Sequence, residues 1–136
     1  MKRSATAIWK GAVKEGSGIL STQSSTLNKT AYSWKARFEE APGTNPEELI
    51  AAAHAGCFSM KLSGVLGVAG FPPEQIETTC TITLENGTIT NSDLVTKVKA
   101  PGISKDVFEK SAADAKANCP VSKVLNAAIG LDATLL

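Results

Sequence analysis

The sequence predicts an α+β fold. Strand-like alternation occupies the first third and much of the second half of the chain, while two helix-like segments follow groups of strands rather than alternating with single strands. The length of 136 residues is that of one domain, so we expect residues 1–136 to fold as a single domain.

The first third of the chain is predicted to be an antiparallel meander of three strands. Ala5–Val13 and Ile19–Thr22 have strand-like composition, and the glycines around Ser17 supply a turn between them. In Tyr32–Phe38, apolar or aromatic residues recur at every second position. This alternation predicts a third strand, with Arg37 on its polar face.

A long helix is expected to follow the meander. Asn45 is a good N-cap residue, Pro46 suits the first helical position, and Glu48 at the third position completes a pattern that resembles a capping box. Glu48 then has a local structural role, whereas Glu47 remains free to bind another group. The apolar segment continues to about Ala69.

This helix is apolar nearly all round, since nine of the twelve residues in Leu49–Met60 are hydrophobic. Lys61 and three later glycines argue against a membrane span, because a charge at the centre of a span costs about 2.5–3.5 kcal/mol. A helix of this kind must be covered on all sides. A short chain has little material for that, so we expect a long buried central helix in an intertwined homodimer.

The second half of the chain is predicted to hold a hairpin, two helices and a last strand. Asn86-Gly87 is a hairpin signal, and the polar stretch Asn91–Asp93 indicates a bulge in the second strand of that hairpin. The expected segments are strands at Ile76–Leu84 and within Thr88–Ala100, a helix at Ser104–Asn118, a short helical turn after Cys119, and a strand at about Ala128–Leu135.

Composition excludes several classes of function. The net charge is +1, from 14 basic and 13 acidic residues, and the basic residues are scattered, so neither nucleic acid nor a membrane is an expected partner. No apolar core of signal-peptide length follows Met1–Arg3. Three cysteines, an odd number, fit a reducing cytoplasm better than a disulfide framework.

Cys57 and Cys119 stand in contexts that suit sulfur chemistry. Neither belongs to a CxxC motif, so we expect no metal and no thioredoxin-type turn. His54 and Lys61 lie one helical turn on either side of Cys57, and cationic neighbours favour a thiolate. Cys119 precedes Pro120 at a helix start, where free N–H groups also favour a thiolate. A packing role for Cys57 and a capping role for Cys119 are equally compatible with these contexts.

The remaining candidates each have a structural explanation. His54 beside Cys57 would suit a Cys–His acyl-transfer enzyme, although a histidine satisfied by hydrogen bonds is the favoured interpretation. Cys80 falls on the apolar alternation of its strand, which favours core packing. Arg37 on a polar strand face would ordinarily be a solvated surface residue.

Four motifs together give the chain a specific resemblance. Arg37-Phe38-Glu39, the segment from Gly43 to Leu49, the segment from Ala51 to Cys57, and Asn118-Cys119-Pro120-Val121-Ser122 resemble the OsmC/Ohr family of osmotically inducible and organic hydroperoxide resistance proteins. The resemblance covers essentially the whole chain and is closer to the OsmC branch.

The resemblance implies a cytoplasmic, homodimeric thiol peroxidase of oxidative or osmotic stress defence, with no cofactor. Cys57 would be the peroxidatic cysteine and Cys119 the resolving cysteine, while Arg37 and Glu47 would orient and activate the Cys57 thiolate. The implied partners are an organic hydroperoxide, with hydrogen peroxide as a further candidate, and a dithiol reductant of thioredoxin or lipoyl type. Apolar lining residues near Cys57, including Phe58, Met60 and Leu62, would favour alkyl or lipid hydroperoxides.

Helix geometry adds a constraint to this implied site. Glu47 and Cys57 are ten residues apart, which is about 15 Å along a continuous helix. The two side chains cannot line one small site of a single subunit, so we expect Arg37 and Glu47 to be donated by a second subunit. Two other functions stay open: the acyl-transfer enzyme, and a non-catalytic, stress-related ligand-binding dimer in which Cys57 is a packing residue.

Overall fold

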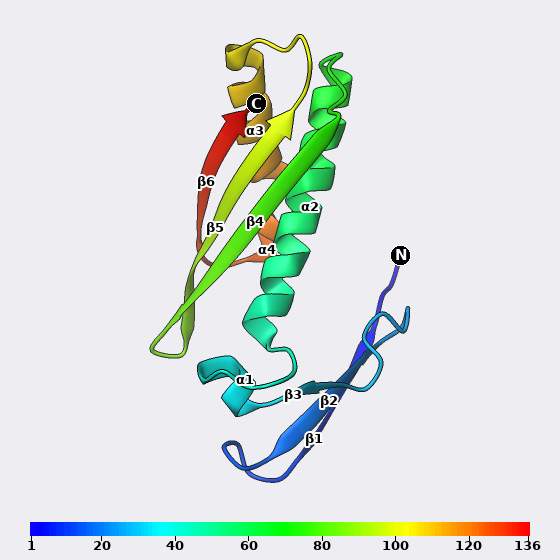
Figure 1. Cartoon of the computed structure of the whole chain (residues 1–136), viewed down its shortest axis with the longest axis vertical. Coiled ribbons are helices and arrows are strands. Elements are labelled where there is room, and N and C mark those ends of the chain that lie inside the picture. The colour runs from blue at the N-terminus through cyan, green and yellow to red at the C-terminus, as the bar shows by residue number, and fades with distance from the viewer. The chain divides into compact units, whose positions relative to one another are not determined.

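The computed structural model describes residues 1–136 and has an α+β fold with two three-stranded sheets and four helices (Figure 1). The chain divides into two compact units, Met1–Leu49 and Ile50–Leu136, with the long helix α2 running across the division. In chain order the elements are β1 (Ala5–Lys10), β2 (Ser17–Thr22), β3 (Thr30–Tyr32), α1 (Trp34–Phe38), α2 (Pro46–Val68), β4 (Gln75–Glu85), β5 (Thr88–Lys99), α3 (Lys105–Asn118), α4 (Pro120–Val124) and β6 (Ala128–Leu135).

The predicted meander is present in the first unit. Strands β1, β2 and β3 pair antiparallel in sequence order. Trp9 on β1 and Tyr32 on β3 both lie opposite Gly18 of β2, and their ring centroids are 5.3 Å apart. A Cβ atom at Gly18 would collide with both rings, so the aromatic pair requires glycine at this position.

The prediction of a strand over Tyr32–Phe38 is wrong beyond Tyr32. The chain turns into helix α1, because the Ser33 hydroxyl accepts the backbone N–H of Ala36 (3.0 Å) and caps the helix. Residues four apart meet on one face of a helix, and the rings of Trp34 and Phe38 accordingly lie 5.0 Å apart. Residues that alternate with a period of two also include pairs four positions apart, such as Trp34 and Phe38. Over so few residues the pattern therefore fits a helix as well as a strand.

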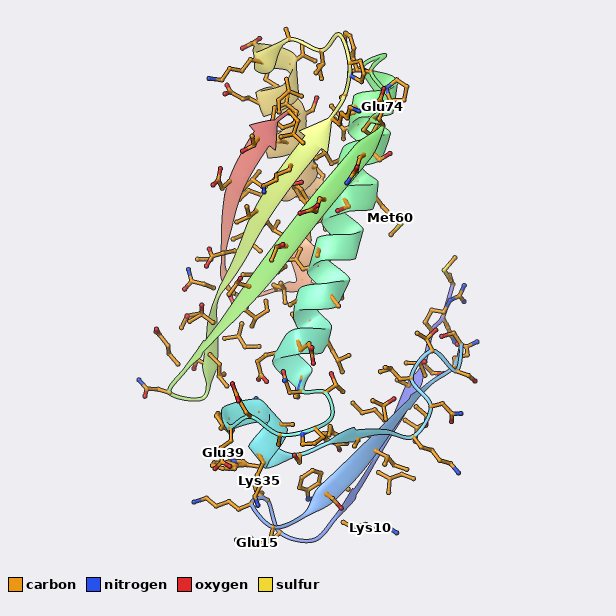
Figure 2. The ribbon with its side chains drawn as sticks, in the orientation of Figure 1. Lys10, Glu15, Lys35, Glu39, Met60 and Glu74 are labelled. Carbon is orange, nitrogen blue, oxygen red and sulfur yellow. The ribbon has the colours of Figure 1, made fainter.

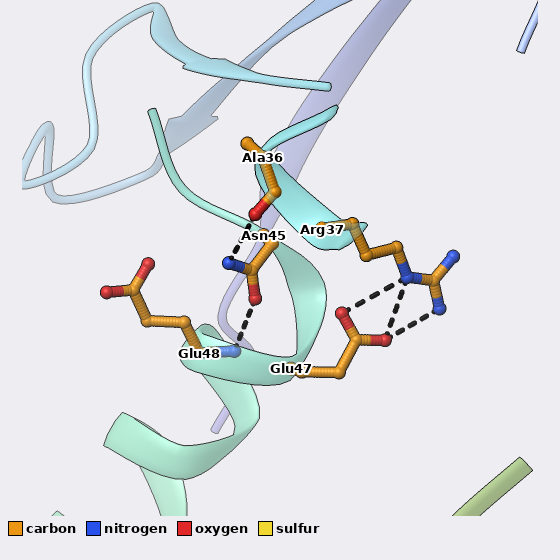
Figure 3. A network of polar contacts seen from close by, with 5 residues as sticks. All are labelled: Ala36, Arg37, Asn45, Glu47 and Glu48. Carbon is orange, nitrogen blue, oxygen red and sulfur yellow. Dashed lines mark hydrogen bonds and ion pairs between the residues drawn. The ribbon is translucent and has the colours of Figure 1, made fainter. Parts of the chain in front are cut away.

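The start of α2 follows the sequence signals. The Asn45 side chain accepts the backbone N–H of Glu48 (2.8 Å) and donates to the carbonyl of Ala36 (3.0 Å), which ties α1 to the beginning of α2 (Figure 3). The Glu48 carboxylate accepts the hydroxyl of Thr44 (3.0 Å). Glu48 therefore has a structural role, as expected, and Glu47 is left free of the cap.

The second unit contains the sheet β4-β5-β6. Strands β4 and β5 form the predicted hairpin, and Asn86 (φ 49°) and Gly87 (φ 76°) both adopt the left-handed backbone that a two-residue type I′ turn requires. The bulge lies at Thr90, just before the stretch predicted from Asn91 onward, since Thr83 pairs with Asn91 while the next residue of β4 pairs with Ile89. Strand β6 runs parallel to β5, and α3 and α4 supply the crossover between them.

The core of this unit lies between the sheet and the helices. Helix α2 contributes one row of buried side chains at every fourth position, from His54 through Phe58 and Leu62 to Leu66. Strand β5 and helix α3 supply most of the rest of the cluster: Leu94, Val98, Phe108, Ala112 and Ala115. Phe58 and Leu62 are completely buried, so the expectation that such residues line a substrate site is wrong for them.

The other faces of α2 are uncovered within the chain. Met60 is 74% exposed and points away from the sheet (Figure 2). Gly56 and Gly64 have open space where a side chain would project. By length and composition alone α2 could cross a membrane, a test that core helices of soluble proteins also pass. The predicted helix is thus present, with one of its faces buried by its own chain.

Candidate active site

The structure brings Cys57 and Cys119 together. Cys57 is half-buried on α2, directly before the core residue Phe58. Cys119 is completely buried and occupies the junction where α3 ends and α4 begins. Both thiols are free, and their side chains are hydrogen-bonded to each other. Two residues that are 62 positions apart in sequence therefore form one dithiol site.

The surroundings of Cys119 favour its anion. Burial by itself raises the pKa of the Cys119 thiol, but hydrogen bonds from the Cys57 thiol, from the backbone and hydroxyl of Ser122 and from the backbone of Val121 together bring the pKa below its ordinary value. The two backbone donors belong to the first turn of α4, whose N–H groups have no partner within the helix. The predicted helix start after Cys119 is confirmed, with Pro120 at its first position.

Within one chain, the surroundings of Cys57 favour its protonated form. Burial raises the pKa of Cys57, the hydrogen bond to Cys119 raises it further, and the N–H of Val121 opposes both only in part. The expectation that His54 and Lys61 lower the pKa of Cys57 is wrong, because neither is among the groups that act on this thiol. A cation able to stabilise a Cys57 thiolate is therefore missing from its surroundings in the chain.

Arg37 and Glu47 form an ion pair in the first unit. The guanidinium Nε of Arg37 lies 2.9 and 3.1 Å from the two carboxylate oxygens of Glu47, and Nη2 lies 2.6 Å from Oε1 (Figure 3). The Glu47 side chain is 13% exposed and that of Arg37 is 38% exposed. The ion pair is a charge-assisted fork that fixes the guanidinium plane and leaves part of it accessible.

A pocket of about 310 Å³ adjoins Arg37 in the same unit. Aromatic and aliphatic side chains dominate its lining, which consists of Trp9, Val13, Tyr32, Ser33, Trp34, Arg37 and Pro46. Arg37 contributes the charged group of this lining. An apolar pocket beside an oriented guanidinium can hold an organic group whose polar end meets the arginine.

His54 is satisfied by hydrogen bonds, as favoured from the sequence. Its Nδ1 lies 2.6 Å from Ser92 Oγ and its Nε2 lies 2.7 Å from Ser122 Oγ, in a completely buried position. With both ring nitrogens occupied, His54 is not a base for Cys57. Ser122 was visible as part of the Cys119 motif, whereas Ser92 had no sequence signal beyond its place on the buried alternation of β5.

Cys80 and Lys61 are the remaining candidates from the sequence. Cys80 is half-buried on β4 beside the core, with its Sγ 3.2 Å from Ser92 Oγ, and burial raises the pKa of this thiol. Lys61 lines a pocket of about 320 Å³ along the uncovered part of α2, together with Met60 and Asp114. No group of three or more His, Cys, Asp or Glu side chains gathers in an arrangement that could hold a metal ion.

The burial of His54 predicts a loss of stability in mild acid. Burial lowers the pKa of His54 below its unfolded value of about 6.5, so below that pH the unfolded chain binds a proton that the folded chain does not. This contribution is complete above pH about 6.5 and is lost as the pH falls toward the folded pKa, by up to about 1.4 kcal/mol per pH unit. Urea unfolding at pH about 7.5 and 5.5 measures it.

The control for this measurement is His54→Gln, which removes the only histidine of the chain. The variant should be less stable at neutral pH but should lose less free energy of unfolding between the two pH values. Equal losses in the variant and the wild type would contradict the assignment.

The α+β fold and the two adjacent free thiols define a class of dithiol proteins. Comparison with known proteins identifies the family. The family model described as OsmC-like protein matches residues 39–133. The chain is 49% identical over 130 residues to Peroxiredoxin OsmC of Escherichia coli (strain K12), covering 93% of this chain and 91% of that protein, and the same values hold for Peroxiredoxin OsmC of Shigella flexneri. The chain therefore belongs to the OsmC family.

Solved structures agree on the fold. The organic hydroperoxide resistance protein OsmC of Legionella pneumophila aligns with a TM-score of 0.73 at 22% identity, over 96% of both chains. The organic hydroperoxide resistance protein OhrB of Bacillus subtilis aligns with a TM-score of 0.68 at 21% identity, over 96% of this chain and 98% of that one. The predicted resemblance to this family is confirmed.

Proposed function

We propose that this protein is a cysteine-based peroxidase in which Cys57 is the peroxidatic and Cys119 the resolving cysteine. The observation that carries the proposal is the hydrogen-bonded pair of free thiols in a chain whose curated relatives are named peroxiredoxins. Reduction of organic hydroperoxides agrees with the names of the structural relatives. A role in oxidative or osmotic stress defence in the cytoplasm follows from the same proposal.

The reaction balances with the two thiols and an external dithiol. The Cys57 thiolate attacks one peroxide oxygen, the O–O bond breaks, and the other oxygen leaves as the alcohol after taking a proton. The resulting Cys57 sulfenic acid condenses with the Cys119 thiol, which forms the disulfide and releases water. A dithiol of thioredoxin or lipoyl type then reduces the disulfide by thiol–disulfide exchange.

We further propose that Arg37 and Glu47 act on the Cys57 of a second subunit. Helix α2 is continuous from Pro46 to Val68, so Glu47 lies about 15 Å along the axis from Cys57 of its own chain. An antiparallel second copy of α2 would cover the faces that one chain leaves exposed and would bring an Arg37–Glu47 pair to each dithiol. We propose on this basis that residues 1–136 work as one OsmC-like domain within a homodimer.

The partner's guanidinium would supply the cation that the surroundings of Cys57 lack. A positive charge close to Cys57 favours its thiolate over that of Cys119, so the proton that Cys57 shares with Cys119 would move to Cys119. Arg37 would then hydrogen-bond the departing oxygen. The apolar pocket beside Arg37 would hold the organic group of the hydroperoxide, and hydrogen peroxide, which has no such group, would be the poorer substrate.

The proposal is tested by mass spectrometry after one equivalent of an alkyl hydroperoxide. The expected product is an intramolecular Cys57–Cys119 disulfide, seen as a loss of about 2 Da with Cys80 still free, because condensation removes both thiol hydrogens. An acyl-transfer enzyme or a non-catalytic ligand-binding dimer would stay reduced. A wild-type protein that remains reduced and consumes no peroxide would contradict the proposed function.

A further inference from the structure

A chain of buried polar side chains leads from β5 to the resolving thiol, and the reaction described above does not use it. Ser92 and His54 are completely buried. The Ser92 hydroxyl meets His54 Nδ1 at 2.6 Å, His54 Nε2 meets the Ser122 hydroxyl at 2.7 Å, and the Ser122 hydroxyl is hydrogen-bonded to the Cys119 sulfur. The four groups come from four segments, β5, α2, α4 and the α3–α4 junction, so the chain exists only in the folded protein.

The surroundings of His54 keep its ring neutral. The hydrogen-bonding groups that face it are uncharged hydroxyls, and the Cys80 thiol of β4 lies 3.9 Å from Nδ1. Asp93 of β5 acts on Cys80 rather than on His54. Because burial also disfavours the charged ring, the imidazole donates from one nitrogen and accepts at the other.

One tautomer of the neutral ring gives the hydrogen bonds a common direction. When Ser92 donates to Nδ1, Nε2 carries the proton and donates to Ser122 Oγ. The Ser122 hydroxyl then has its own hydrogen free for the sulfur of Cys119. In this tautomer each group in the row donates toward the thiol, and that arrangement stabilises an anion at Cys119.

We propose that His54 is a positioning residue for the resolving step: acting through Ser122, it favours the anionic form in which Cys119 attacks Cys57 once peroxide has oxidised Cys57. The proposal rests on the proposed role of Cys119 as the resolving cysteine. In this step the Cys119 thiolate attacks the sulfenic sulfur of Cys57, the S–S bond forms and the S–OH bond breaks. Hydroxide takes up the proton released by Cys119 and leaves as water, while the Cys57 sulfur is reduced and the Cys119 sulfur is oxidised.

The row of hydrogen bonds reaches solvent at Ser122. Ser122 lines a surface pocket of about 400 Å³ together with Ala113, Lys116, Ala117 and Ile129. Water in this pocket can exchange a proton with the Ser122 hydroxyl without passing the Cys57 side of the dithiol. The direction of the hydrogen bonds can therefore reset after each turnover.

The test measures the thiolate of Cys119 directly. In a Cys57→Ser, Cys80→Ala background, Cys119 is the only thiol, and its ultraviolet thiolate absorbance is followed against pH. Ser122→Ala should raise the midpoint by about one unit, since one hydrogen bond to a charged group is lost. His54→Leu should shift the midpoint in the same direction but by less, because His54 acts on Cys119 only through Ser122. His54→Gln, which keeps an N–H donor, should stay closer to the parent.

In proteins that retain all three cysteines, disulfide formation after a peroxide pulse should slow about tenfold in Ser122→Ala, while peroxide attack, measured by sulfenic-acid trapping, changes little.

The matched control is Ser111→Ala, a buried serine on α3 that bonds only the carbonyl of Val107 (2.8 Å) and lies outside the row. It should leave both the thiolate midpoint and the disulfide rate as in the wild type. An unchanged midpoint in Ser122→Ala would overturn the inference even if His54→Leu failed to fold. A wild type that forms no sulfenic acid would instead remove the proposed peroxidase reaction, and the midpoint shift would still decide the role of the row.

Discussion

Replacing Cys57 with serine is expected to abolish hydroperoxide consumption. The thiolate is the nucleophile that cleaves the O–O bond, and a serine hydroxyl does not ionise near neutral pH. Loss of the nucleophile of an enzyme typically costs three or more orders of magnitude, so we expect a residual rate about a thousandfold lower or less. The measurement is the consumption of an alkyl hydroperoxide in the presence of excess dithiol.

Two variants make this result specific. Cys80→Ser changes a half-buried cysteine next to the same core and should retain activity, since a hydroxyl can keep the contact with Ser92. Cys119→Ser should still form the sulfenic acid in a single turnover but should accumulate it instead of the disulfide. Full activity in Cys57→Ser would mean that another group reacts with the peroxide.

A mixed dimer of two impaired variants is expected to recover activity. Arg37→Ala removes charge-assisted hydrogen bonds to the reacting groups and should slow peroxide attack about ten- to hundredfold. Cys57→Ser is inactive for the reason given above. A heterodimer of one Arg37→Ala chain with one Cys57→Ser chain combines an intact Cys57 with an intact Arg37 only if the two meet across the interface. Such a heterodimer, isolated with two affinity tags, should have about half the wild-type activity, since one of its two symmetric sites is complete.

The same experiment excludes the alternative arrangement. If Arg37 served the Cys57 of its own chain, neither site of the heterodimer would be complete and its activity would not exceed the mean of the two parent variants. Arg37→Lys is a useful companion, because it keeps the charge but loses the planar fork with Glu47 and should restore only part of the rate. A chain that stays monomeric while fully active would remove the proposal of a shared site.

Local signals were enough to predict most elements. Residues that lie close together in the sequence predict the bounds of β6, the cap of α2 at Asn45 and the hairpin turn at Asn86-Gly87. The exception is α1, because the pattern of five residues does not distinguish a strand from a helix. The Ser33 cap favours the helix. The parallel pairing of β6 with β5 also lay outside the reach of local patterns, since it depends on the crossover through α3 and α4.

The sequence by itself determined the family, the α+β class and the choice of Cys57 and Cys119 as candidate reactive cysteines, because these depend on motifs whose residues lie close together in the chain. Only the tertiary structure decided what surrounds those cysteines. His54 meets Ser92 and Ser122 from 38 and 68 residues away, and neither contact leaves a periodic trace in the sequence. The preference for an anion at Cys119 over Cys57 has the same origin: burial and hydrogen bonds set the pKa of a thiol, and both arise only when distant segments pack together.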